Sequence, residues 1–405
     1  MKILVLAGGA DQIALINELH KRGHEVVLLD YFENPPAKPF ADKHYCASTL
    51  DVDAVKQIAI QEKVDLVCTA CTDQALLTVA NVSEQLVLPC YISYQTALNV
   101  TNKSYMKRVM SENNIPTSKY VILDKVDLGL IKEFQFPVVV KPVDCNSSKG
   151  VKRIDSINEL PLYLEEAISY SRTKTAIVEE FKEGVEISVD YYVEGKDAKL
   201  LSATTSLKIK NKKSFTIVCS DYPAIDEEQR GIVERIGNQV AQAFGLKDCP
   251  LFIQMIANGK NISVIEFSAR MGGGSKYNLI RVLSGVDIMS KYVDLILGEK
   301  PTVTPRNQVG YCKMVYLYCF PGVFDHVDGF ENLKEEGIIE DYFLYKTKGM
   351  EISKAETSGD RPAGYLIVGN TKKELLEKLR AADSRLRVIS VDGKDIMMHN
   401  LIIQD

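Results

Sequence analysis

In the first thirty residues the spacing of apolar residues changes from that of a strand to that of a helix and back to that of a strand. Few folds accommodate this order. The apolar run KILVLA at 2–7 leads to two glycines, a stretch with helical spacing of apolar residues follows, and a second apolar run ends at Asp30. A strand, a tight turn, a helix and a second strand in this order predict the start of a parallel sheet covered by helices. Gln12 stands near the position of the third glycine of the dinucleotide fingerprint, which argues against a NAD-dependent dehydrogenase.

The same alternation continues over the next sixty residues. A helical pattern near 51–62 precedes the apolar strand VDLVCTA at 64–70, a second helix follows Asp73, and the extended segment LVLPCYIS occupies 86–93. Strands that alternate with helices are typical of a parallel sheet. We therefore predict a small α/β domain over residues 1–98.

The character of the sequence changes after about residue 120. Apolar strands now follow one another across short polar turns, as in VEISVDYYVEGKDAKLLSATTS and LFIQMIANGKNISVIEFSA. The turns VEGKD and IANGKN suit hairpins, and Asn258 and Gly259 tolerate the positive φ that such turns require. This pattern predicts antiparallel pairing and an α+β domain over 99–305, with a smaller lobe at about 115–185.

The last hundred residues show a third pattern. Two strands, GYCKMVYLYCF and AGYLIVGN, are followed by the amphipathic helix TKKELLEKLRAAD. These elements are enough for one small layer of sheet with a helix packed on it. We predict a small α+β lobe over residues 306–405.

Composition argues against several classes of partner. The chain has 405 residues, 46% of them hydrophobic, and its formal net charge of -5 gives no footprint for nucleic acid or an anionic membrane. No apolar stretch approaches the roughly 18 residues that span a bilayer. The nine cysteines are scattered in apolar runs, as expected of reduced thiols in a cytoplasmic protein. Cys68 and Cys71 form a CxxC without a second pair, so we interpret them as ordinary thiols at a strand end.

A lysine follows three valines in FPVVVKPV, which places Lys141 at the end of a buried strand. A buried ammonium without an anion is costly, so Lys141 requires a counter-ion or a water-filled cleft. The polar turn that follows contains Ser147, Ser148, Lys149 and Gly150. Its backbone donors and its cation suit phosphate oxygens, but a solvated hairpin loop explains the pattern equally well.

Two acidic features come next. The segment IVEEFKEGVEIS gathers four glutamates near a strand end, for which an exposed acidic connection is the commoner explanation. Further on, Gln254 and Glu266 lie on strands joined by a tight turn, and antiparallel pairing would bring them together. Ser268 and Arg270 follow Glu266 at intervals of two residues, so in a strand their side chains would lie on the same face as that of Glu266. Oxygen ligands of this kind suit Mg²⁺ bound together with substrate phosphates.

The order of these motifs over essentially the whole chain resembles the ATP-grasp superfamily. The branch that it resembles includes biotin carboxylase, carbamoyl phosphate synthetase, purine-biosynthesis carboxylate ligases and bacterial L-amino acid ligases. The segments GGADQ, ADKHYCASTLD and CTACTDQAL are similar to the domain that precedes the ATP-grasp fold in this branch. The resemblance implies an α/β N-terminal domain of the pre-ATP-grasp type, an α+β ATP-grasp fold and a small C-terminal α+β lobe.

The resemblance also implies a nucleotide site for ATP. Lys103 and Lys141 correspond to the lysines that bind the phosphates, and the loop from Asp144 to Gly150 corresponds to the one that covers them. The hinge that bonds adenine through its backbone and the acid that binds ribose correspond to Glu179, Glu180, Phe181, Lys182 and Glu186.

Catalytic and metal positions are implied in the same way. Arg270 and Lys208 correspond to catalytic positions near the substrate and the γ-phosphate. Gln254, Glu266 and Ser268 correspond to the ligands of one or two Mg²⁺ ions, with Mn²⁺ as an alternative. The family usually has an acid where Gln254 stands and an asparagine where Ser268 stands, so this chain is expected to hold its metal more weakly.

The implied chemistry is attack of a carboxylate on the γ-phosphate of ATP, after which an amine displaces phosphate from the acylphosphate. We therefore expect a cytoplasmic ligase with a small carboxylic acid, most simply an amino acid, and an amine as substrates. One alternative is a bicarbonate-using carboxylase or carbamoyl phosphate synthetase-like enzyme. Another is a nucleotide-binding homologue with weakened catalysis, which Gln254 and Ser268 suggest. If copies of the chain associate, a homodimer is the first expectation.

Overall fold

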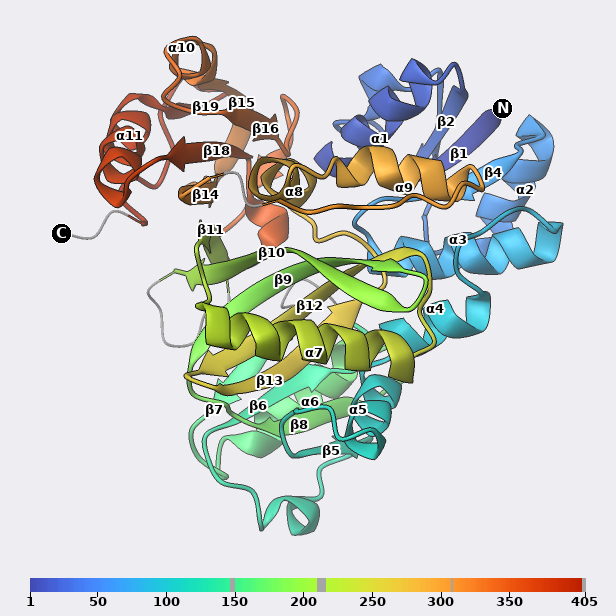
Figure 1. The fold of residues 1–405 in the computed structure, drawn as a ribbon, viewed down its shortest axis with the longest axis vertical. Coiled ribbons are helices and arrows are strands. Elements are labelled where there is room, and N and C mark those ends of the chain that lie inside the picture. Colours follow the sequence, from blue (N-terminus) through green and yellow to red (C-terminus); the bar gives the residue numbers. More distant parts are fainter. Residues whose placement is uncertain (146–149, 210–215, 307–308, 403–405) are drawn as a thin grey trace.

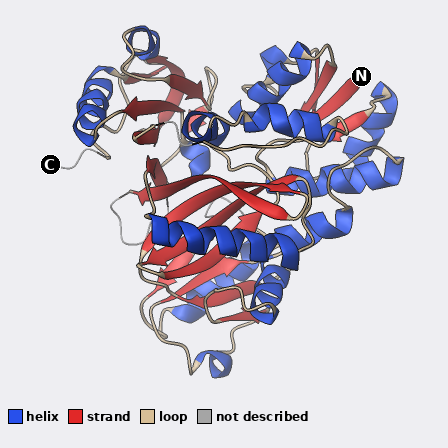
Figure 2. Cartoon of the chain, viewed as in Figure 1, coloured by secondary structure: helices blue, strands red, loops and turns tan. Residues whose placement is uncertain are grey.

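The computed structural model of the protein describes residues 1–145, 150–209, 216–306 and 309–402. In the orientation of Figure 1, the N-terminal residues and the last hundred residues form two smaller bodies above a larger middle part. Figure 2 shows that each of these parts is built on a sheet with helices packed against it. Within the described ranges, no helix combines the length and the apolar character needed to cross a membrane.

The N-terminal part is a four-stranded parallel sheet. Its elements are β1 (Lys2–Leu6), α1 (Ala10–Lys21), β2 (Glu25–Asp30), β3 (Lys43–Cys46), α2 (Val52–Glu62), β4 (Leu66–Cys68) and α3 (Asp73–Leu86). The strands pair in the order β3-β2-β1-β4, all in parallel. Ile3 and Val5 pack into one apolar core while Leu4 and Leu6 pack into another, so both faces of the sheet are covered. The predicted parallel α/β domain is confirmed.

Two helices lead from this sheet to a smaller antiparallel sheet. The elements are α4 (Tyr94–Thr101), α5 (Lys103–Glu112), β5 (Tyr120–Leu123), β6 (Val138–Pro142), β7 (Lys152–Ile154), α6 (Leu160–Tyr170) and β8 (Ala176–Glu180). The strands pair in the order β5-β8-β6-β7. The side chain of Asn102 begins α5 by accepting the backbone N–H groups of Ser104 and Tyr105. This cap fixes where the helix starts and hence where Lys103 lies.

The middle part continues into a large antiparallel sheet. Its elements are β9 (Val185–Glu194), β10 (Asp197–Lys208), β11 (Ile217–Tyr222), α7 (Glu227–Ala243), β12 (Cys249–Asn258), β13 (Asn261–Ser268), α8 (Lys276–Ser284) and α9 (Ile288–Ile296). Helix α7 lies across the sheet in Figure 1. The predicted hairpin at IANGKN is present, but only Gly259 takes a positive φ, +56°, because Asn258 still belongs to β12 and pairs with Asn261.

The C-terminal lobe shares this large sheet. Its elements are β14 (Tyr311–Tyr316), β15 (Gly322–Asp328), α10 (Phe330–Glu335), β16 (Asp341–Leu344), β17 (Glu351–Ile352), β18 (Ala363–Gly369), α11 (Lys372–Arg385) and β19 (Arg387–Ser390). Strand β14 pairs with β11, which gives one sheet in the order β13-β12-β9-β10-β11-β14-β18-β16. The lobe is therefore joined to the middle part by backbone hydrogen bonds as well as by the chain.

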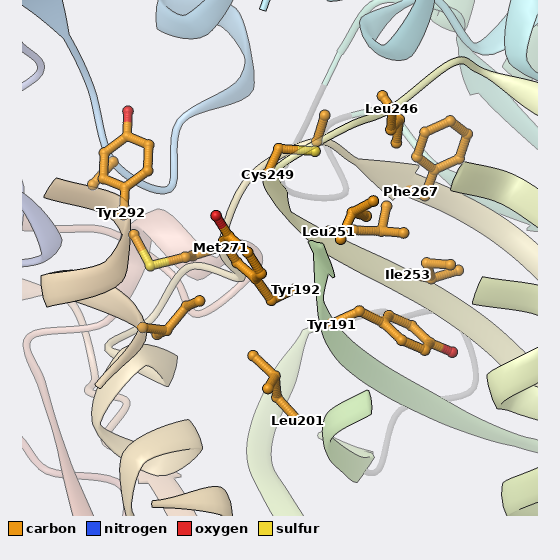
Figure 3. Close-up of a cluster of buried hydrophobic side chains, with 14 of the residues drawn as sticks. Tyr191, Tyr192, Leu201, Leu246, Cys249, Leu251, Ile253, Phe267, Met271 and Tyr292 are labelled. Atoms are coloured by element: carbon orange, nitrogen blue, oxygen red, sulfur yellow. The ribbon is translucent and has the colours of Figure 1, made fainter. Parts of the chain in front are cut away.

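Both faces of the large sheet carry helices, as neighbouring tyrosines of β9 show. Tyr191 points toward α7 and donates its hydroxyl to the carbonyl of Val233 at 2.7 Å. Tyr192 points the other way, toward Met271 and Tyr292 (Figure 3). Alternation along one strand thus anchors α7 on one face and α9 on the other. The segment 86–93, predicted as extended, begins with the last residue of α3 and forms no strand.

Candidate active site

A cavity of about 380 Å³ lies between the small antiparallel sheet and the large one. Its walls combine the ends of β6 and β8 with residues of β9, β10, β12 and β13. Ten of the residues that the sequence assigned to nucleotide, metal or catalysis line it: Lys103, Lys141, Glu179, Glu180, Phe181, Lys182, Glu186, Lys208, Gln254 and Glu266. The fold therefore brings residues from well-separated segments into one cavity.

Two buried lysines share one buried carboxylate at the wall of this cavity. The Nζ of Lys141 lies 2.6 Å from Glu179 Oε1, and the Nζ of Lys107 lies 2.7 Å from Glu179 Oε2. Lys107 also donates to the hydroxyl of Thr117 at 2.6 Å. The cluster keeps one excess positive charge, because two ammonium groups face a single carboxylate. The anion that Lys141 required is thus Glu179, and the excess charge remains for a ligand.

Protonation of this cluster follows from its burial and its charges. Burial alone would raise the pKa of Glu179, but the ammonium groups of Lys107 and Lys141 outweigh burial and hold that pKa at about 2. Burial lowers the pKa of Lys107, and the attraction of Glu179 offsets only part of that effect. For Lys141 burial acts in the same direction, but the nearby glutamates dominate and raise its pKa.

Lys103, the first residue of α5, contacts both Cys145 and Glu266. Its Nζ donates to the carbonyl of Cys145 at 2.8 Å and lies 3.4 Å from Glu266 Oε2. Gly150 has a φ of +71°, and a Cβ there would lie 2.9 Å from Pro142, so glycine is required at this end of the loop. Between Cys145 and Gly150, the sequence predicts that Ser147, Ser148 and Lys149 contact phosphate. These three residues lie outside the described residues.

Glu186, Lys208 and Gln254 form a second charged group in the cavity. Lys208 Nζ lies 2.5 Å from Glu186 Oε2, and the Gln254 side chain donates to Glu186 Oε1 at 3.2 Å. Gln254 lies directly opposite Glu266 in the β12–β13 register, which is the pairing that the sequence predicted. Because the amide nitrogen of Gln254 faces Glu186, its oxygen is free to face another ligand.

The donor set fits a magnesium ion held jointly with phosphates. Among the described residues no group of three or more His, Cys, Asp or Glu side chains is gathered as a metal site. Mg²⁺ in nucleotide sites is nevertheless commonly bound through one or two carboxylates together with phosphate oxygens and waters. Glu266 supplies one carboxylate at the cavity wall, and the oxygen of Gln254 lies beside it in register.

Replacing Gln254 with glutamate is expected to lower the Mg²⁺ concentration that half-saturates nucleotide binding by roughly 10-fold. The added charge favours the cation, whereas without metal it repels Glu186 and loses the present hydrogen bond. Titration of nucleotide binding with Mg²⁺ and a melting curve in chelator would measure both effects. Gln242→Glu, the same change on an exposed part of α7, is the matched control. An unchanged Mg²⁺ requirement would show that Gln254 does not contact the metal.

Arg270 lines two larger cavities that meet the 380 Å³ cavity at Gln254 and Glu266. Cavities of about 890 and 600 Å³ share Gln254, Glu266 and Arg270 in their walls. The guanidinium of Arg270 makes a two-pronged ion pair with the carboxylate of Asp73, with Nε 2.7 Å from Oδ1 and Nη2 paired with Oδ2. Ser268, a predicted metal ligand, lines the 890 Å³ cavity. Burial would raise the pKa of Asp73, but Arg270, with a smaller contribution from the Ser268 hydroxyl, outweighs burial and lowers it.

The glycine run after Arg270 is a tightly packed turn. A Cβ on Gly272 would lie 2.9 Å from Asp190 Oδ1, and a Cβ on Gly274 would lie 2.8 Å from the Tyr316 hydroxyl. Gly274 also has a φ of +77°, which other residues adopt at a cost. The run brings β13 into contact with the C-terminal lobe, so two of its glycines are needed for packing.

Replacing Gly274 with alanine is expected to lower the free energy of unfolding by about 1–2 kcal/mol from the left-handed backbone alone. The contact with Tyr316 adds to that cost. Gly273→Ala is the matched control, because a Cβ there meets nothing closer than 3.6 Å. Chemical denaturation of the two variants measures the difference, and equal stabilities would refute the packing role of Gly274.

Family comparisons agree with this geometry. Residues 134–278 match the family model of the ATP-grasp domain, and residues 315–390 match that of the L-amino acid ligase C-terminal domain 2. The chain is an ATP-grasp protein. It belongs to the ATP-grasp carbon–nitrogen ligase family, whose members use ATP and Mg²⁺.

Individual relatives are distant but cover nearly the whole chain. A phosphoribosylamine–glycine ligase from Caldanaerobacter subterraneus subsp. tengcongensis is 22% identical over 97% of each chain. The solved structure of an L-amino acid ligase from Bacillus licheniformis superposes with a TM-score of 0.80 at 21% identity, over 96% of this chain and 98% of that one. The biotin carboxylase domain of a Hydrogenobacter thermophilus 2-oxoglutarate carboxylase also gives 0.80, at 16% identity over 99% and 92%.

Several side chains in this ATP-grasp site were not identified from the sequence. Lys107 is fully buried on α5, and its spacing of four from Lys103 on a helix was the signal available. Asp73 begins α3 directly after a strand and its turn, a common place for a functional acid in a parallel sheet. Asp11 and Arg361 both line the 600 Å³ cavity. No local pattern in the sequence indicated that these two residues lie close together.

Proposed function

We propose that this protein is an ATP-dependent carboxylate–amine ligase that activates a small carboxylic acid, an amino acid in the simplest case, as an acylphosphate. One observation carries the proposal. The 380 Å³ cavity with its lysines meets two further cavities at Gln254 and Glu266, so a nucleotide and two small substrates can share one reaction centre. The matched L-amino acid ligase domain at 315–390 supports an amino acid as the acid.

In the first step a carboxylate oxygen of the acid attacks the γ-phosphorus of ATP. The bond from that phosphorus to the bridging oxygen breaks, and ADP leaves with the electron pair. Lys103, Lys141 and Lys208 place ammonium groups around the cavity to spread the charge of the phosphates. Mg²⁺ bound with the nucleotide would add to this neutralisation, with Glu266 and Gln254 as its protein ligands.

In the second step the nitrogen of the amine attacks the acyl carbon of the acylphosphate. The carbon–oxygen bond to phosphate then breaks, phosphate leaves, and the nitrogen loses a proton. Arg270 is held in place by Asp73 at the wall common to both substrate cavities. A fixed guanidinium there would stabilise the negative charge that develops on the tetrahedral oxygen.

An ADP-release screen tests the proposal. Amino acids and other small acids are supplied with ATP and Mg²⁺, alone and with amines, and we expect ADP and phosphate only with a matching acid and amine. Melting curves with ATP run in parallel show whether the nucleotide binds. Binding of ATP without ADP from any pair would favour a nucleotide-binding homologue. ADP release that depends on bicarbonate would favour a carboxylase or carbamoyl phosphate synthetase-like enzyme.

A further inference from the structure

A buried ion pair in the large sheet takes no part in the proposed chemistry. Asp190 of β9 is 2% exposed, and Lys276, the first residue of α8, is 4% exposed. The Nζ of Lys276 lies 3.9 Å from Asp190 Oδ2, which accepts the Ser202 hydroxyl at 2.7 Å. Among the described residues, neither Lys276 Nζ nor Asp190 Oδ1 has a hydrogen-bond partner. The two charges are therefore close to one another without a hydrogen bond between them.

Phe252 of β12 lies next to this pair in the sheet. It is opposite Asp190 of β9 on one side and opposite Ser268 of β13 on the other. Directly opposite residues of antiparallel strands share a face, so the Phe252 ring projects from the same face as the Asp190 carboxylate. Phe252 lines both the 890 and the 600 Å³ cavities, whereas the described lining of these cavities includes neither Asp190 nor Lys276. The ring thus forms cavity wall, and the buried pair adjoins it from outside the cavities.

Two cations lie over the ring of Phe252. The Nζ of Lys276 is 4.9 Å from the ring centre, and the central carbon of the Arg270 guanidinium is 5.9 Å from it. Cations within about 6 Å of an aromatic ring centre are attracted to the ring, most strongly where water is excluded. Gly272 packs over the pair, because a Cβ there would lie 2.9 Å from both Lys276 Cδ and Asp190 Oδ1. The ammonium is therefore confined beside the ring.

The orientation of Arg270 depends on this ring as well as on Asp73. Its Nε and Nη2 pair with the carboxylate of Asp73, and its Nη1 donates to the Met271 carbonyl at 2.6 Å. These bonds use three of the five N–H groups of a guanidinium, so two remain for a substrate. The pairing with Asp73 fixes the guanidinium within its own plane, and a ring over it limits its tilt out of that plane. The direction of the two remaining N–H groups thus depends on Phe252.

We propose that Lys276 and Asp190 are positioning residues for the reaction centre. The ammonium of Lys276 holds the Phe252 ring, and the ring orients Arg270 toward the substrates. The inference rests on the role of Arg270 in the proposed ligase function. Stability alone explains the pair poorly, because a buried ion pair offsets the loss of water only when its groups are well hydrogen-bonded. Burial lowers the pKa of Lys276, and the attraction of Asp190 offsets only part of that effect.

A neutral version of the pair tests this role. Asp190→Asn/Lys276→Met keeps side chains of similar size and leaves no buried charge unpaired, so the protein should stay folded. With the substrates found in the ADP-release screen, we expect kcat to fall roughly 5- to 30-fold, the effect of one buried contact between a cation and a ring. KM for ATP should stay the same, because the described lining of the 380 Å³ cavity includes neither residue. Lys373→Met on α11, where the side chain is 87% exposed, is the control. Wild-type kcat in the folded double variant would overturn the inference.

Phe252→Leu tests the route from the pair to Arg270. It removes the ring but keeps an apolar side chain, so by itself it should lower kcat to a similar extent. Adding the neutral pair to Phe252→Leu should lower kcat little further, because both changes interrupt the same series of contacts. Phe324→Leu, which truncates a buried ring of the C-terminal lobe, is the matched control. Full activity of Phe252→Leu, or losses that multiply, would contradict the route. The activity of Phe252→Leu decides this even if the double variant does not fold.

Nuclear magnetic resonance of ¹⁵N-labelled arginine side chains covers the case in which the screen yields no ADP. Arg270→Gln identifies the Nε–H resonance of Arg270 by its loss. Asp190→Asn/Lys276→Met should shift this resonance, and so should Phe252→Leu, whereas Lys373→Met should leave it in place. An unshifted resonance in the neutral pair would refute the positioning role, whatever the screen shows. A shifted resonance without turnover would support the positioning and count only against the ligase function.

Discussion

Replacing Glu179 with glutamine is expected to lower the free energy of unfolding by about 3–5 kcal/mol, the effect of breaking a buried ion pair. Glu179 is the only carboxylate within ion-pair distance of Lys107 and Lys141 in the described part of the chain, and all three side chains are buried. Without it, two ammonium groups lose their counter-ion inside the protein. Urea denaturation measures the loss. Glu183→Gln removes the same charge from an exposed loop and should change stability little.

The same variant has a pH signature. The folded pKa of Glu179 is about 2, below its ordinary value of 4.5, so its contribution is complete above pH 4.5 and is lost as the pH falls toward 2. The stability difference between wild type and Glu179→Gln should therefore shrink over that acidic range and stay constant from pH 5 to 7. A difference that does not depend on pH would mean that the carboxylate charge is not what stabilises the cluster.

Replacing Arg270 with glutamine is expected to lower kcat by roughly 100- to 1,000-fold, the effect of removing one donor that stabilises a developing oxyanion. Arg270 reaches the wall common to both substrate cavities, and Asp73 holds its guanidinium at two points. The measurement is ADP release with the matched acid and amine, alongside ATP binding. Arg281→Gln on the exposed side of α8 is the control. Unchanged turnover would exclude Arg270 from the chemical steps.

A double variant separates catalysis from folding. Arg270→Gln alone leaves the carboxylate of Asp73, whose side chain is only 14% exposed, without its cation, so it should also destabilise the protein. Asp73→Asn/Arg270→Gln neutralises both partners and should recover most of the stability while turnover stays low. If turnover returned with stability, the loss in the single variant would come from misfolding.

Several residues of the 380 Å³ cavity could be predicted from sequence because their signals are local. Strand periodicity placed Lys141 at the end of β6, and the turn at Gly259 brought β12 and β13 together as a hairpin. Counting from the turn would put Gln254 opposite Ile265, but a β-bulge between Gln254 and Met255 shifts the register by one residue and puts it opposite Glu266. The phosphate-contacting roles of Ser147, Ser148 and Lys149 stay predictions.

The substrate side could not be predicted in this way. Arg270 was expected to face substrate charge, but how it is held depends on Asp73, nearly two hundred residues earlier in the chain. In the glycine run after Arg270, Gly274 is held by Tyr316 of the C-terminal lobe, whose hydroxyl donates to the Gly274 carbonyl at 3.1 Å. Such contacts depend on how complete domains pack, and no periodicity within a strand or helix encodes them.

The sequence by itself determined the fold class, the family resemblance and ten residues that line the 380 Å³ cavity, because helix and strand periods and turn chemistry act over a few residues. Only the tertiary structure decided which charges are paired and which are not. It joined Glu179 to two lysines and Arg270 to Asp73, and it left Arg361 and Asp11 facing one cavity. Charge pairing depends on distances of a few ångströms between remote segments, and those distances exist only after the sheets and helices have packed.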